Sequence, residues 1–522
     1  MKKKIKYNIY KKEIEKTVTY IPLRYIIAAF LALIEVLLVI SSVIVLCYYV
    51  PYFYAAAYLT QIFCVIKIVS SDDNPDYKVP WLLFVLILPI VGFMLYFLFY
   101  SRKLKKKYAK RLKNLFDKSY KKDDDDMIAR LEKENPEAAS QAKMIKNISG
   151  AHLFENTHQK YYSSGESMFK DMLNDLKKAE KFIFMEYFII EEGHFWNSIL
   201  DILKLKASQG VEVKVIYDDI GCMKTLSGSY YKKLKKFGID CVTFSRLKGS
   251  ADSEFNNRDH KKITVIDGVV GYTGGVNIAD EYINHISRFG YWKDAGLRLE
   301  GDAVKELTNL FLISYGLNVK NIMEERNNRY PESSKIDNVN GILIPFGDGP
   351  RPIYPRRVGK SVINNMLATA NKYAYIMTPY LIIDNDLCQT IEDASLRGVD
   401  VRIILPHIPD KKIIFSITKS FYDRLMKAGV KIYEYERGFV HSKVYLVDDM
   451  YAMVGTINLD YRSLVHHFEN GVWMYKTDCI KDIKRDFENS FNECIYITEQ
   501  MKKVGVGTKL FRAIVKIFAP LL

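Results

Sequence analysis

The sequence predicts an α/β protein in which one layered unit occurs twice, after an N-terminal membrane region. Two observations predict the duplication. Strands and helices alternate in the same order near residues 180–220 and 373–405. His260 and His441 are each followed by Lys at two positions, Asp at seven, Gly at fourteen and Asn at seventeen. The chain has nine histidines, so chance does not account for this agreement, and an internal repeat does.

Apolar runs in the first 100 residues predict the membrane region. The run Tyr25–Val50 is too long for a signal peptide and is expected to be a retained transmembrane helix. Trp81–Tyr100 is expected to be a second span. The shorter run Phe53–Val69 contains Gln61 and Lys67 and is either a third span or an interfacial segment.

Charge predicts how this region crosses the membrane. The residues before the first apolar run and after the last one are basic, whereas the loop 72–76 is acidic. Basic segments stay in the cytoplasm, so both ends of the region are expected there, which requires an even number of crossings. We therefore expect two spans, 25–50 and 81–100, with 53–69 shallow, and three spans as the alternative.

The amino-acid composition limits the classes of molecule that the protein is expected to bind. The net charge of +15 over 522 residues indicates an anionic partner, either lipid headgroups or nucleic acid. The seven cysteines are scattered without a CxxC pair, which argues against a disulfide framework or a zinc site. Residues 101–150 are charged and helix-forming, and we expect a solvated helical linker there.

The two copies are expected at 151–330 and 331–500, with elements in matching order. In the first copy a strand (182–190), a helix (197–210) and a strand (211–221) precede a helix and strand at 230–244. In the second copy the same elements are expected at 373–382, 387–398, 399–406 and 421–435. Gly210 and Gly398 end equivalent helices.

The repeated motif suits a phosphate substrate. Apolar β-branched residues follow Lys262 and Lys443, so each motif is expected on a strand, with His and Lys on one face. The ammonium group binds an anion as a point charge, and the imidazole attacks phosphorus or moves a proton near neutral pH. Asp267 and Asp448 fall at turns and are expected to close them.

The doubled pattern resembles the phospholipase D superfamily, whose mark is HxKxxxxD followed by GGxN, present twice. More narrowly, the chain resembles bacterial cardiolipin synthases. One departure is Gly455-Thr456, where the first copy has Gly274-Gly275. The stretches that carry the narrower resemblance are 80–99, 185–189, 256–268, 271–282, 291–301, 378–382, 428–449 and 455–464.

This resemblance implies two tandem phospholipase D-like α/β/α sandwich halves, packed face to face around a shared active site. The implied reaction joins two phosphatidylglycerol molecules into cardiolipin and releases glycerol through a covalent phosphohistidine, without a metal or other cofactor. The implied partners are phosphatidylglycerol, cardiolipin and the bilayer, with no nucleic acid. The implied location is the bacterial cell membrane, multi-pass, with the catalytic region in the cytoplasm.

Roles for individual residues follow from the resemblance. His260 is expected to be the nucleophile and His441 the acid and base, although the sequence itself is symmetric here. Lys262, Lys443, Asn277 and Asn458 are expected to hold the phosphate oxygens. Asp294 and Glu469 follow their histidines by 34 and 28 residues, at matching places in each half, as orienting carboxylates would.

Other readings remain open from sequence alone. A phospholipase that uses water would carry the same motifs, and so would a membrane-tethered nuclease; a non-catalytic lipid-binding protein would be expected to have lost a His or Lys. His466 and His467 point to opposite faces if they lie on a strand, so a shared metal is not expected. Residues 505–522 are expected to form an amphipathic helix on the lipid surface, with an ordinary packed helix as the alternative.

Overall fold

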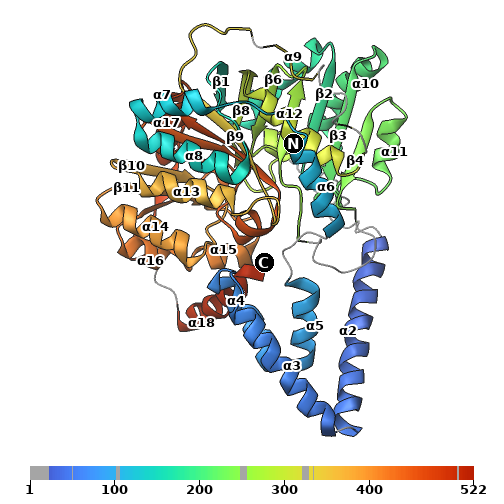
Figure 1. Ribbon diagram of the computed structural model, residues 1–522. Helices are drawn as coiled ribbons and strands as arrows, with labels where there is room; N and C mark the ends of the chain where they lie inside the picture. Colours follow the sequence, from blue (N-terminus) through green and yellow to red (C-terminus); the bar gives the residue numbers. More distant parts are fainter. Residues whose placement is uncertain are drawn as a thin grey trace, which may run out of the picture.

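The computed structural model describes residues 23–49, 51–100, 106–246, 256–319, 322, 329–332, 334–501 and 505–521. These residues form a globular α/β region and a tail of apolar helices that projects from one end of it (Figure 1). The basic residues 2–16 and 102–105, on which the predicted membrane orientation partly depends, lie outside the described residues.

The first half is built on a seven-stranded mixed sheet in the order β1-β8-β6-β5-β2-β3-β4. Strands β2, β3 and β4 run parallel, as the predicted strand-helix-strand order requires, and the other pairs are antiparallel. The strands are β1 (Thr157–Tyr162), β2 (Phe182–Tyr187), β3 (Glu212–Asp218), β4 (Asp240–Phe244), β5 (Lys262–Ile266), β6 (Val270–Gly274) and β8 (Gly296–Gly301).

The second half has an eight-stranded mixed sheet in the order β17-β12-β11-β10-β14-β15-β16-β9. Its parallel strands β10, β11 and β12 correspond to β2, β3 and β4. The strands are β9 (Ile342–Asp348), β10 (Tyr373–Met377), β11 (Asp400–Pro406), β12 (Lys431–Tyr435), β14 (Val444–Val447), β15 (Tyr451–Gly455), β16 (Glu469–Tyr475) and β17 (Cys494–Tyr496). The predicted α/β class is therefore confirmed.

Helices separate and cover the two sheets. The helices of the first half are α9 (Gly165–Lys178), α10 (His194–Ser208), α11 (Tyr230–Lys235) and α12 (Val304–Gly316). Those of the second half are α13 (Val358–Ala368), α14 (Asn385–Leu396), α15 (Lys412–Thr418), α16 (Tyr422–Lys427) and α17 (Ile480–Phe491). Every residue of α12 is buried, and its core cluster contains side chains from both sheets, such as Phe184 and Leu446.

Alternation along the strands explains this layering. In β2, Phe182 and Phe184 belong to the core shared with α12, whereas Ile183 and Met185 face a separate core under α9 and α10. Neighbouring residues of a strand point to opposite faces, so both faces of the sheet are covered. The central core joins the two halves, because residues of both halves bury the same helix.

Residues 106–149 form helices, but the expectation of a solvated linker is wrong. The helices are α6 (Lys106–Asp117), α7 (Asp125–Glu134) and α8 (Pro136–Ser149). Buried side chains such as Leu131 and Ile145 place α7 and α8 in the outer core of the second half. Leu112 of α6 packs into the central core. The charges cover only the outer face of helices whose other face is apolar.

The tail consists of α2 (Leu23–Tyr49), α3 (Pro51–Val69), α4 (Pro75–Ile87) and α5 (Pro89–Phe99) (Figure 1). Among the described residues, one helix is long and apolar enough to cross a membrane, at Tyr52–Val69, and Leu33–Leu46 is a shorter apolar stretch. The segment expected to lie shallow, with a third span as the alternative, is therefore the one long and apolar enough to cross a membrane.

The expected span Trp81–Tyr100 is wrong, because the run is broken. Leu88, which precedes Pro89, leaves the helical region at φ −124° and ψ 76°, since a residue before proline disfavours helical geometry. Helices α4 and α5 then fold back on each other: the Tyr77 and Tyr100 rings lie 5.6 Å apart, and the Tyr100 hydroxyl donates to Asp73 at 2.5 Å. This helical hairpin begins and ends at the same level.

The C-terminal segment forms helix α18 (Val506–Phe518), followed by a short turn, η5 (Ala519–Leu521). The helix was expected at this place, and it leaves an apolar face exposed that includes Leu510 and Ile514. It lies beside α4, where the Phe84 and Phe518 rings are 5.7 Å apart.

Candidate active site

Backbone pairing between the halves fixes the first histidine. The His260 N–H donates to the carbonyl oxygen of Phe468 at 2.9 Å, and the Phe468 N–H donates to that of Arg258 at 2.8 Å. Asp259 and Phe468 thus form a parallel bridge between the segment before β5 and the segment before β16. The next residue along the second segment is Glu469, so this bridge sets its carboxylate beside His260.

A second ladder repeats this arrangement on the other side. Strand β7 (Tyr291–Lys293) pairs in parallel with β13 (Gly438–Val440). The His441 N–H continues the ladder by donating to the carbonyl oxygen of Lys293 at 2.7 Å. Asp294 follows Lys293, and its carboxylate therefore lies next to His441.

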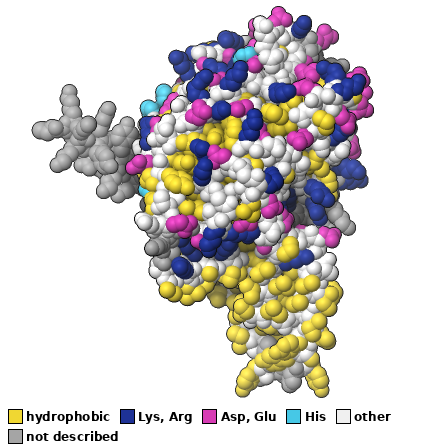
Figure 2. All heavy atoms as spheres, turned by 90° about the vertical axis from the view of Figure 1, so that its left-hand side faces the viewer, with side chains coloured by type: hydrophobic (Ala, Val, Ile, Leu, Met, Phe, Trp, Pro, Cys, Tyr) yellow, Lys and Arg dark blue, Asp and Glu magenta, His cyan; other side chains and the backbone are white. Residues whose placement is uncertain are grey.

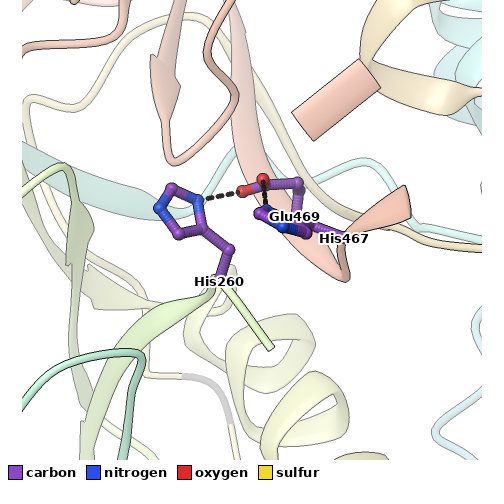
Figure 3. Close-up of side chains that lie close together, drawn as sticks. All are labelled: His260, His467 and Glu469. Carbon is purple, nitrogen blue, oxygen red and sulfur yellow. Dashed lines mark hydrogen bonds and ion pairs between the residues drawn. The ribbon is translucent and has the colours of Figure 1, made fainter. Parts of the chain in front are cut away.

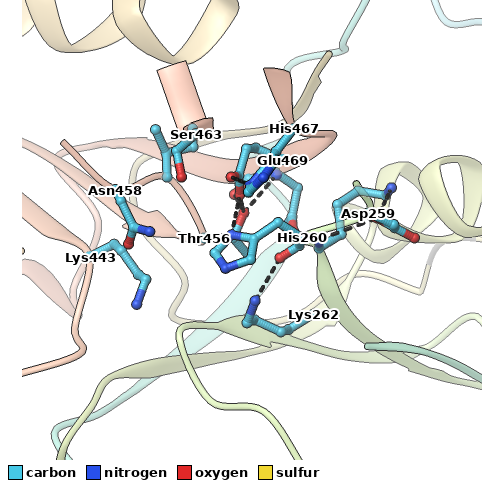
Figure 4. Close-up of polar contacts among 12 residues, drawn as sticks. Asp259, His260, Lys262, Lys443, Thr456, Asn458, Ser463, His467 and Glu469 are labelled. Atoms are coloured by element: carbon cyan, nitrogen blue, oxygen red, sulfur yellow. Dashed lines mark hydrogen bonds and ion pairs between the residues drawn. The ribbon is translucent and has the colours of Figure 1, made fainter. Parts of the chain in front are cut away.

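The two ladders exchange the orienting carboxylates between the halves. His260 Nδ1 lies 2.9 Å from Glu469 Oε2 (Figures 3 and 4). His441 Nδ1 lies 2.7 Å from Asp294 Oδ2. Both predicted carboxylates are in the site, but each was associated with the histidine of its own half, and that pairing is wrong. A carboxylate at Nδ1 fixes the tautomer that leaves Nε2 free to act.

The departure Gly275/Thr456 has a geometric reason. A Cβ added at Gly275 would lie 2.0 Å from Asp294 Oδ1, so only glycine allows this carboxylate its place. At the equivalent position, the Thr456 hydroxyl donates to Glu469 Oε2, the oxygen that faces His260 (Figure 4). Nothing in the spacing of the motif predicts that Thr456 is a partner of this carboxylate.

The two motif lysines lie at the start of their strands and inside the protein. Lys262 is the first residue of β5, and its Nζ donates to the carbonyl oxygen of His260 at 2.7 Å. Lys443, just before β14, donates likewise to the carbonyl oxygen of His441. The histidines precede the strands. The expectation that His and Lys share one strand is therefore wrong, and only the residues at the end of each motif lie on the strand.

Burial changes the acidity of all four groups. It lowers the pKa of Lys262 to about 8 and that of Lys443 to about 7, although Glu469 and Asp294 oppose the shift. Burial, followed by the charge of Lys443, lowers the pKa of His441 to about 4. Burial and the charges of Lys262 and then Lys443 hold the pKa of His260 well below its usual range.

These shifts show that the groups belong to one cluster. His260 is influenced by a lysine of the second half, and His441 by one of the first half. The pKa of Asp294 is also depressed, because the attraction of His441 and Lys443 outweighs the burial that opposes ionisation. The site therefore holds two neutral imidazoles and two lysines whose pKa values lie near neutral pH, and a bound anion would favour the protonated form of both lysines.

The two asparagines predicted to hold phosphate are buried but differ in their contacts. Asn277 accepts a hydrogen bond from the Ile189 N–H at 3.1 Å and donates to the Tyr282 hydroxyl at 2.8 Å. Asn458 donates to Asp460 at 3.2 Å, and its Oδ1 has no partner among the described residues. In Figure 4 Asn458 lies beside Lys443. Because Oδ1 is an acceptor, a contact from Asn458 to a phosphate oxygen would use the second N–H of its Nδ2.

Asp267 and Asp448 lie at turns, as expected, and hold backbone. The Asp267 carboxylate accepts from the N–H groups of Glu180, Lys181 and Phe182 at 2.8 Å each. Asp448 accepts from the N–H groups of Asn371, Lys372 and Tyr373 at 2.7–2.8 Å. Each Asp therefore anchors the strand next to its motif, and we assign it no step of the chemistry.

His467 is a residue that sequence reasoning did not place in the site. Its ring centroid lies 5.4 Å from that of His260, and its Nδ1 lies 3.5 Å from Glu469 Oε1 (Figure 3). Burial lowers its pKa to about 3. The only signal in the sequence was its position two residues before Glu469, which is on the same face of an extended segment.

His260, His467 and Glu469 could also approach a metal ion, since their ligand atoms lie within 4.8 Å of one another. His260 Nδ1 and Glu469 are, however, hydrogen-bonded to each other. A metal bound by these atoms would replace the contact that orients His260. The donor set therefore suits a hydrogen-bonded pair, and His466, the other histidine considered for a metal, is not part of the group.

A buried ionic network behind His260 was also missed. Arg258 Nη2 lies 2.7 Å from Asp218 Oδ1, and the Asp259 N–H donates to the other oxygen of Asp218 at 3.0 Å. Lys261 Nζ lies 3.0 Å from Glu186 Oε1 and 2.5 Å from Asp259 Oδ1. These pairs fix both residues that flank His260, so the network stiffens the segment that carries it.

Comparison with known proteins gives a consistent result. A family model described as "Cardiolipin synthase, PLD-like domain" matches residues 172–287 and 363–491. A second model, "Phospholipase_D-nuclease N-terminal", matches residues 60–99. The first match includes both motif histidines and lysines, both predicted asparagines and Glu469, and the second covers α4, α5 and part of α3.

Relatives cover most of the chain. An uncharacterized protein of Streptococcus mutans is 42% identical over 88% of this chain and 99% of its own length. A cardiolipin synthase of Alkalihalophilus pseudofirmus is 34% identical over 82% of this chain and 85% of its own. Cardiolipin synthase 2 of Bacillus cereus is 32% identical over 88% and 89%. The crystal structure of a Haemophilus influenzae phosphatidylserine synthase shares the fold, with a TM-score of 0.57, 16% identity, and coverage of 73% of this chain and 97% of that one.

Proposed function

The chain belongs to the phospholipase D-like cardiolipin synthase family, and on that premise we propose that it joins two phosphatidylglycerol molecules into cardiolipin and releases glycerol. The reaction is a phosphatidyl transfer between two alcohols of the same kind. Two displacements through a covalent enzyme intermediate divide it into steps of similar difficulty.

The crossed histidine–carboxylate pairs carry this proposal. Each imidazole is held through Nδ1, by Glu469 at 2.9 Å and Asp294 at 2.7 Å, and so offers Nε2 to a substrate. Two lysines with lowered pKa values accompany them. A phosphodiester would add a negative charge beside these two lysines.

In the first displacement, His260 Nε2 forms a bond to phosphorus, and the bond from phosphorus to the glycerol oxygen breaks. His441, protonated at Nε2, gives that proton to the departing oxygen, which is a poor leaving group as an alkoxide. The assignment of His260 as nucleophile follows the family pattern. Its low pKa supports the role, because a neutral imidazole is required for attack.

In the second displacement, His441 accepts the proton of a hydroxyl of the second phosphatidylglycerol. That oxygen attacks phosphorus, and the bond between phosphorus and His260 breaks. His441 is neutral in the empty site, since its pKa is about 4. The negative charge of the bound phosphate raises this pKa, so that His441 carries a proton when the first glycerol leaves.

Lys262 and Lys443 stabilise the phosphate oxygens as negative charge shifts onto them. Asn458 adds a donor through its Nδ2, while the contacts of Asn277 to Ile189 and Tyr282 favour a role in holding the wall of the site. Asp294 and Glu469 stabilise each histidine when it becomes cationic or bonded to phosphorus.

We propose that the tail holds this chemistry at a bilayer. We assign α2 and α3 as the pair that crosses the membrane, and α4 and α5 as a hairpin that enters it and returns. The Asp73–Tyr100 contact supports this, because it joins the beginning and the end of the hairpin. Two crossings keep the catalytic region on the side of residue 23, which the charge pattern assigns to the cytoplasm. Within the globular region we retain halves that meet near residue 330.

Product analysis tests the function. Purified full-length protein with phosphatidylglycerol as its only lipid is expected to form cardiolipin and glycerol in equal amounts. Formation of phosphatidate without cardiolipin would identify a hydrolase that uses the same site and would refute the synthase. His260→Ala is the control, since contaminating activity would survive this substitution.

A further inference from the structure

A second cation-rich cavity lies outside the site described above. It occupies about 870 Å³ between α18 and the helices α15 and α16 of the second half, in the range of about 300–1,000 Å³ typical of ligand pockets. Five cationic side chains line it: Lys419, Lys427, Lys509, Arg512 and Lys516. The first two come from the globular region and the other three from α18.

The two faces of α18 differ in chemistry. Its cations line the cavity and therefore face the protein. The opposite face carries exposed apolar side chains, namely Val506, Leu510, Phe511, Ile514 and Ile517. A helix with a free apolar face and basic groups along its other side is typical of one that lies in a membrane interface.

Carboxylates offset only part of the charge in the cavity. Glu434 already accepts from Tyr422 at 3.0 Å and lies 2.9 Å from His407 and 3.2 Å from Lys419. Asp423 lies 2.8 Å from Lys427. Glu499 is the third carboxylate that lines the cavity, so three carboxylates face five cationic side chains.

In the part of the chain that the structure describes, two cationic side chains of α18 form no ion pair with a carboxylate that lines the cavity. Arg512 Nε is buried and has no hydrogen-bond partner among the described residues. Lys516 lies 4.2 Å above the Phe421 ring, and burial lowers the pKa of its ammonium. Cationic groups that pair with no carboxylate of the cavity favour an incoming anion.

The phosphate group of a membrane lipid is an anion that could reach this cavity. Helix α18 lies beside α4, where the apolar tail meets the globular region (Figure 1). Figure 2 shows hydrophobic side chains gathered along this lower edge next to the tail, with Lys and Arg side chains directly above them. An apolar edge with basic groups just above matches the order of acyl chains and phosphates in a lipid leaflet.

We propose that the cavity between α15, α16 and α18 binds the phosphate headgroup of an anionic membrane phospholipid, whose acyl chains lie against the apolar face of α18. This lipid is held apart from the reacting one, because none of the cavity residues belongs to the histidine cluster. The binding does not depend on the identity of the reaction in the active site.

Photocrosslinking with the full-length enzyme in mixed micelles tests the proposal. The probes are phosphatidylglycerol and phosphatidylcholine analogues with a diazirine at the start of one acyl chain, and the labelled peptides are mapped by mass spectrometry. We expect the phosphatidylglycerol probe to label 407–427 and 505–521 about tenfold more than the phosphatidylcholine probe, as for a charge-assisted phosphate contact. Equal labelling by both probes would overturn the proposal.

Variants provide a second, independent comparison. Arg512→Gln with Lys516→Gln is expected to lower the labelling of 505–521 by about tenfold, and Arg512→Lys with Lys516→Arg to retain it. Lys232→Gln with Lys236→Gln, on the exposed surface near α11, is the matched control for the loss of two charges. Undiminished labelling in the first pair would refute the site. Cardiolipin formation measured in parallel reports on the proposed function separately.

Discussion

The two histidine sites of this chain have the same plan but different parts. His441 faces Asp294, and Gly275 leaves room for that carboxylate. His260 faces Glu469, and Thr456 donates a hydrogen bond to it. At His260 the carboxylate is the longer Glu469 with the Thr456 hydroxyl as its partner, whereas at His441 it is the shorter Asp294 next to Gly275. The comparison teaches that the position of the carboxylate oxygen is kept while the residues that achieve it vary.

The neighbours of the two rings differ as well. His260 lies against Phe188 at 5.1 Å and His467 at 5.4 Å, whereas His441 lies against Tyr282 at 5.2 Å and Trp292 at 5.4 Å. An unequal setting suits unequal roles, one residue forming a bond to phosphorus and the other moving protons. The predictions below separate these roles.

The largest effects are expected from removing either imidazole. With phosphatidylglycerol, His260→Ala and His441→Ala should each lower kcat by about 10²–10⁴ or more. With a phosphatidyl ester of p-nitrophenol, the leaving group needs no proton. We therefore expect His441→Ala, but not His260→Ala, to release nitrophenolate in a burst that absorbance records. A burst from His260→Ala instead would reverse the two roles.

The crossed pairing predicts which residues are coupled. Glu469→Gln and Asp294→Asn should each lower kcat by about 10²-fold or more, because a misplaced tautomer disables the imidazole. The changes in unfolding free energy caused by two substitutions differ from additivity by about 0.5–3 kcal/mol when the residues are in contact, and they add when the residues are distant. Thermal unfolding measures these changes. We expect coupling between His260→Ala and Glu469→Gln and additivity between His260→Ala and Asp294→Asn. The reverse pattern would mean that each half keeps its own carboxylate.

Gly275 and Thr456 should respond unequally to alanine. Gly275→Ala brings a Cβ within 2.0 Å of Asp294 Oδ1 and must displace the carboxylate. Thr456→Ala removes a single hydrogen bond of about 1–3 kcal/mol, so kcat should fall by about tenfold, and further in Gly275→Ala. Steady-state kinetics on both variants, with circular dichroism as a check of folding, measure the difference. Equal losses would mean that the two positions do not act on the carboxylates.

The smallest expected effect is the number of protons that the protein takes up when it binds phosphate. At pH 7.5, Lys443, with a pKa of about 7, is less protonated than Lys262, with a pKa of about 8. Inorganic phosphate raises both pKa values, so its binding must take up protons, and more at Lys443. Calorimetry in buffers of different ionisation enthalpy measures this uptake. Lys443→Arg should reduce it more than Lys262→Arg, because arginine stays charged; the opposite order would contradict the assigned pKa values.

The repeat and its elements could be predicted from sequence because they depend on local spacing. Lys262 begins its strand, and Asp267 and Asp448 close turns, as expected, whereas the histidines precede the strands on which they were expected. The exchange of Asp294 and Glu469 could not be predicted, because spacing within a half says nothing about which residues meet across it. Leu88 and Pro89 show another limit: a hydropathy run continues through a break that backbone geometry imposes.

The crossed pair has a consequence for the synthesis of the protein. Glu469 lies 209 residues after His260 in the chain. A ribosome that has passed His260 but not yet Glu469 has delivered the imidazole without the group that aligns it. The tail emerges first and can already reach the membrane, yet we expect the nascent chain to stay inert toward the lipids around it until the segment that carries Glu469 has been made.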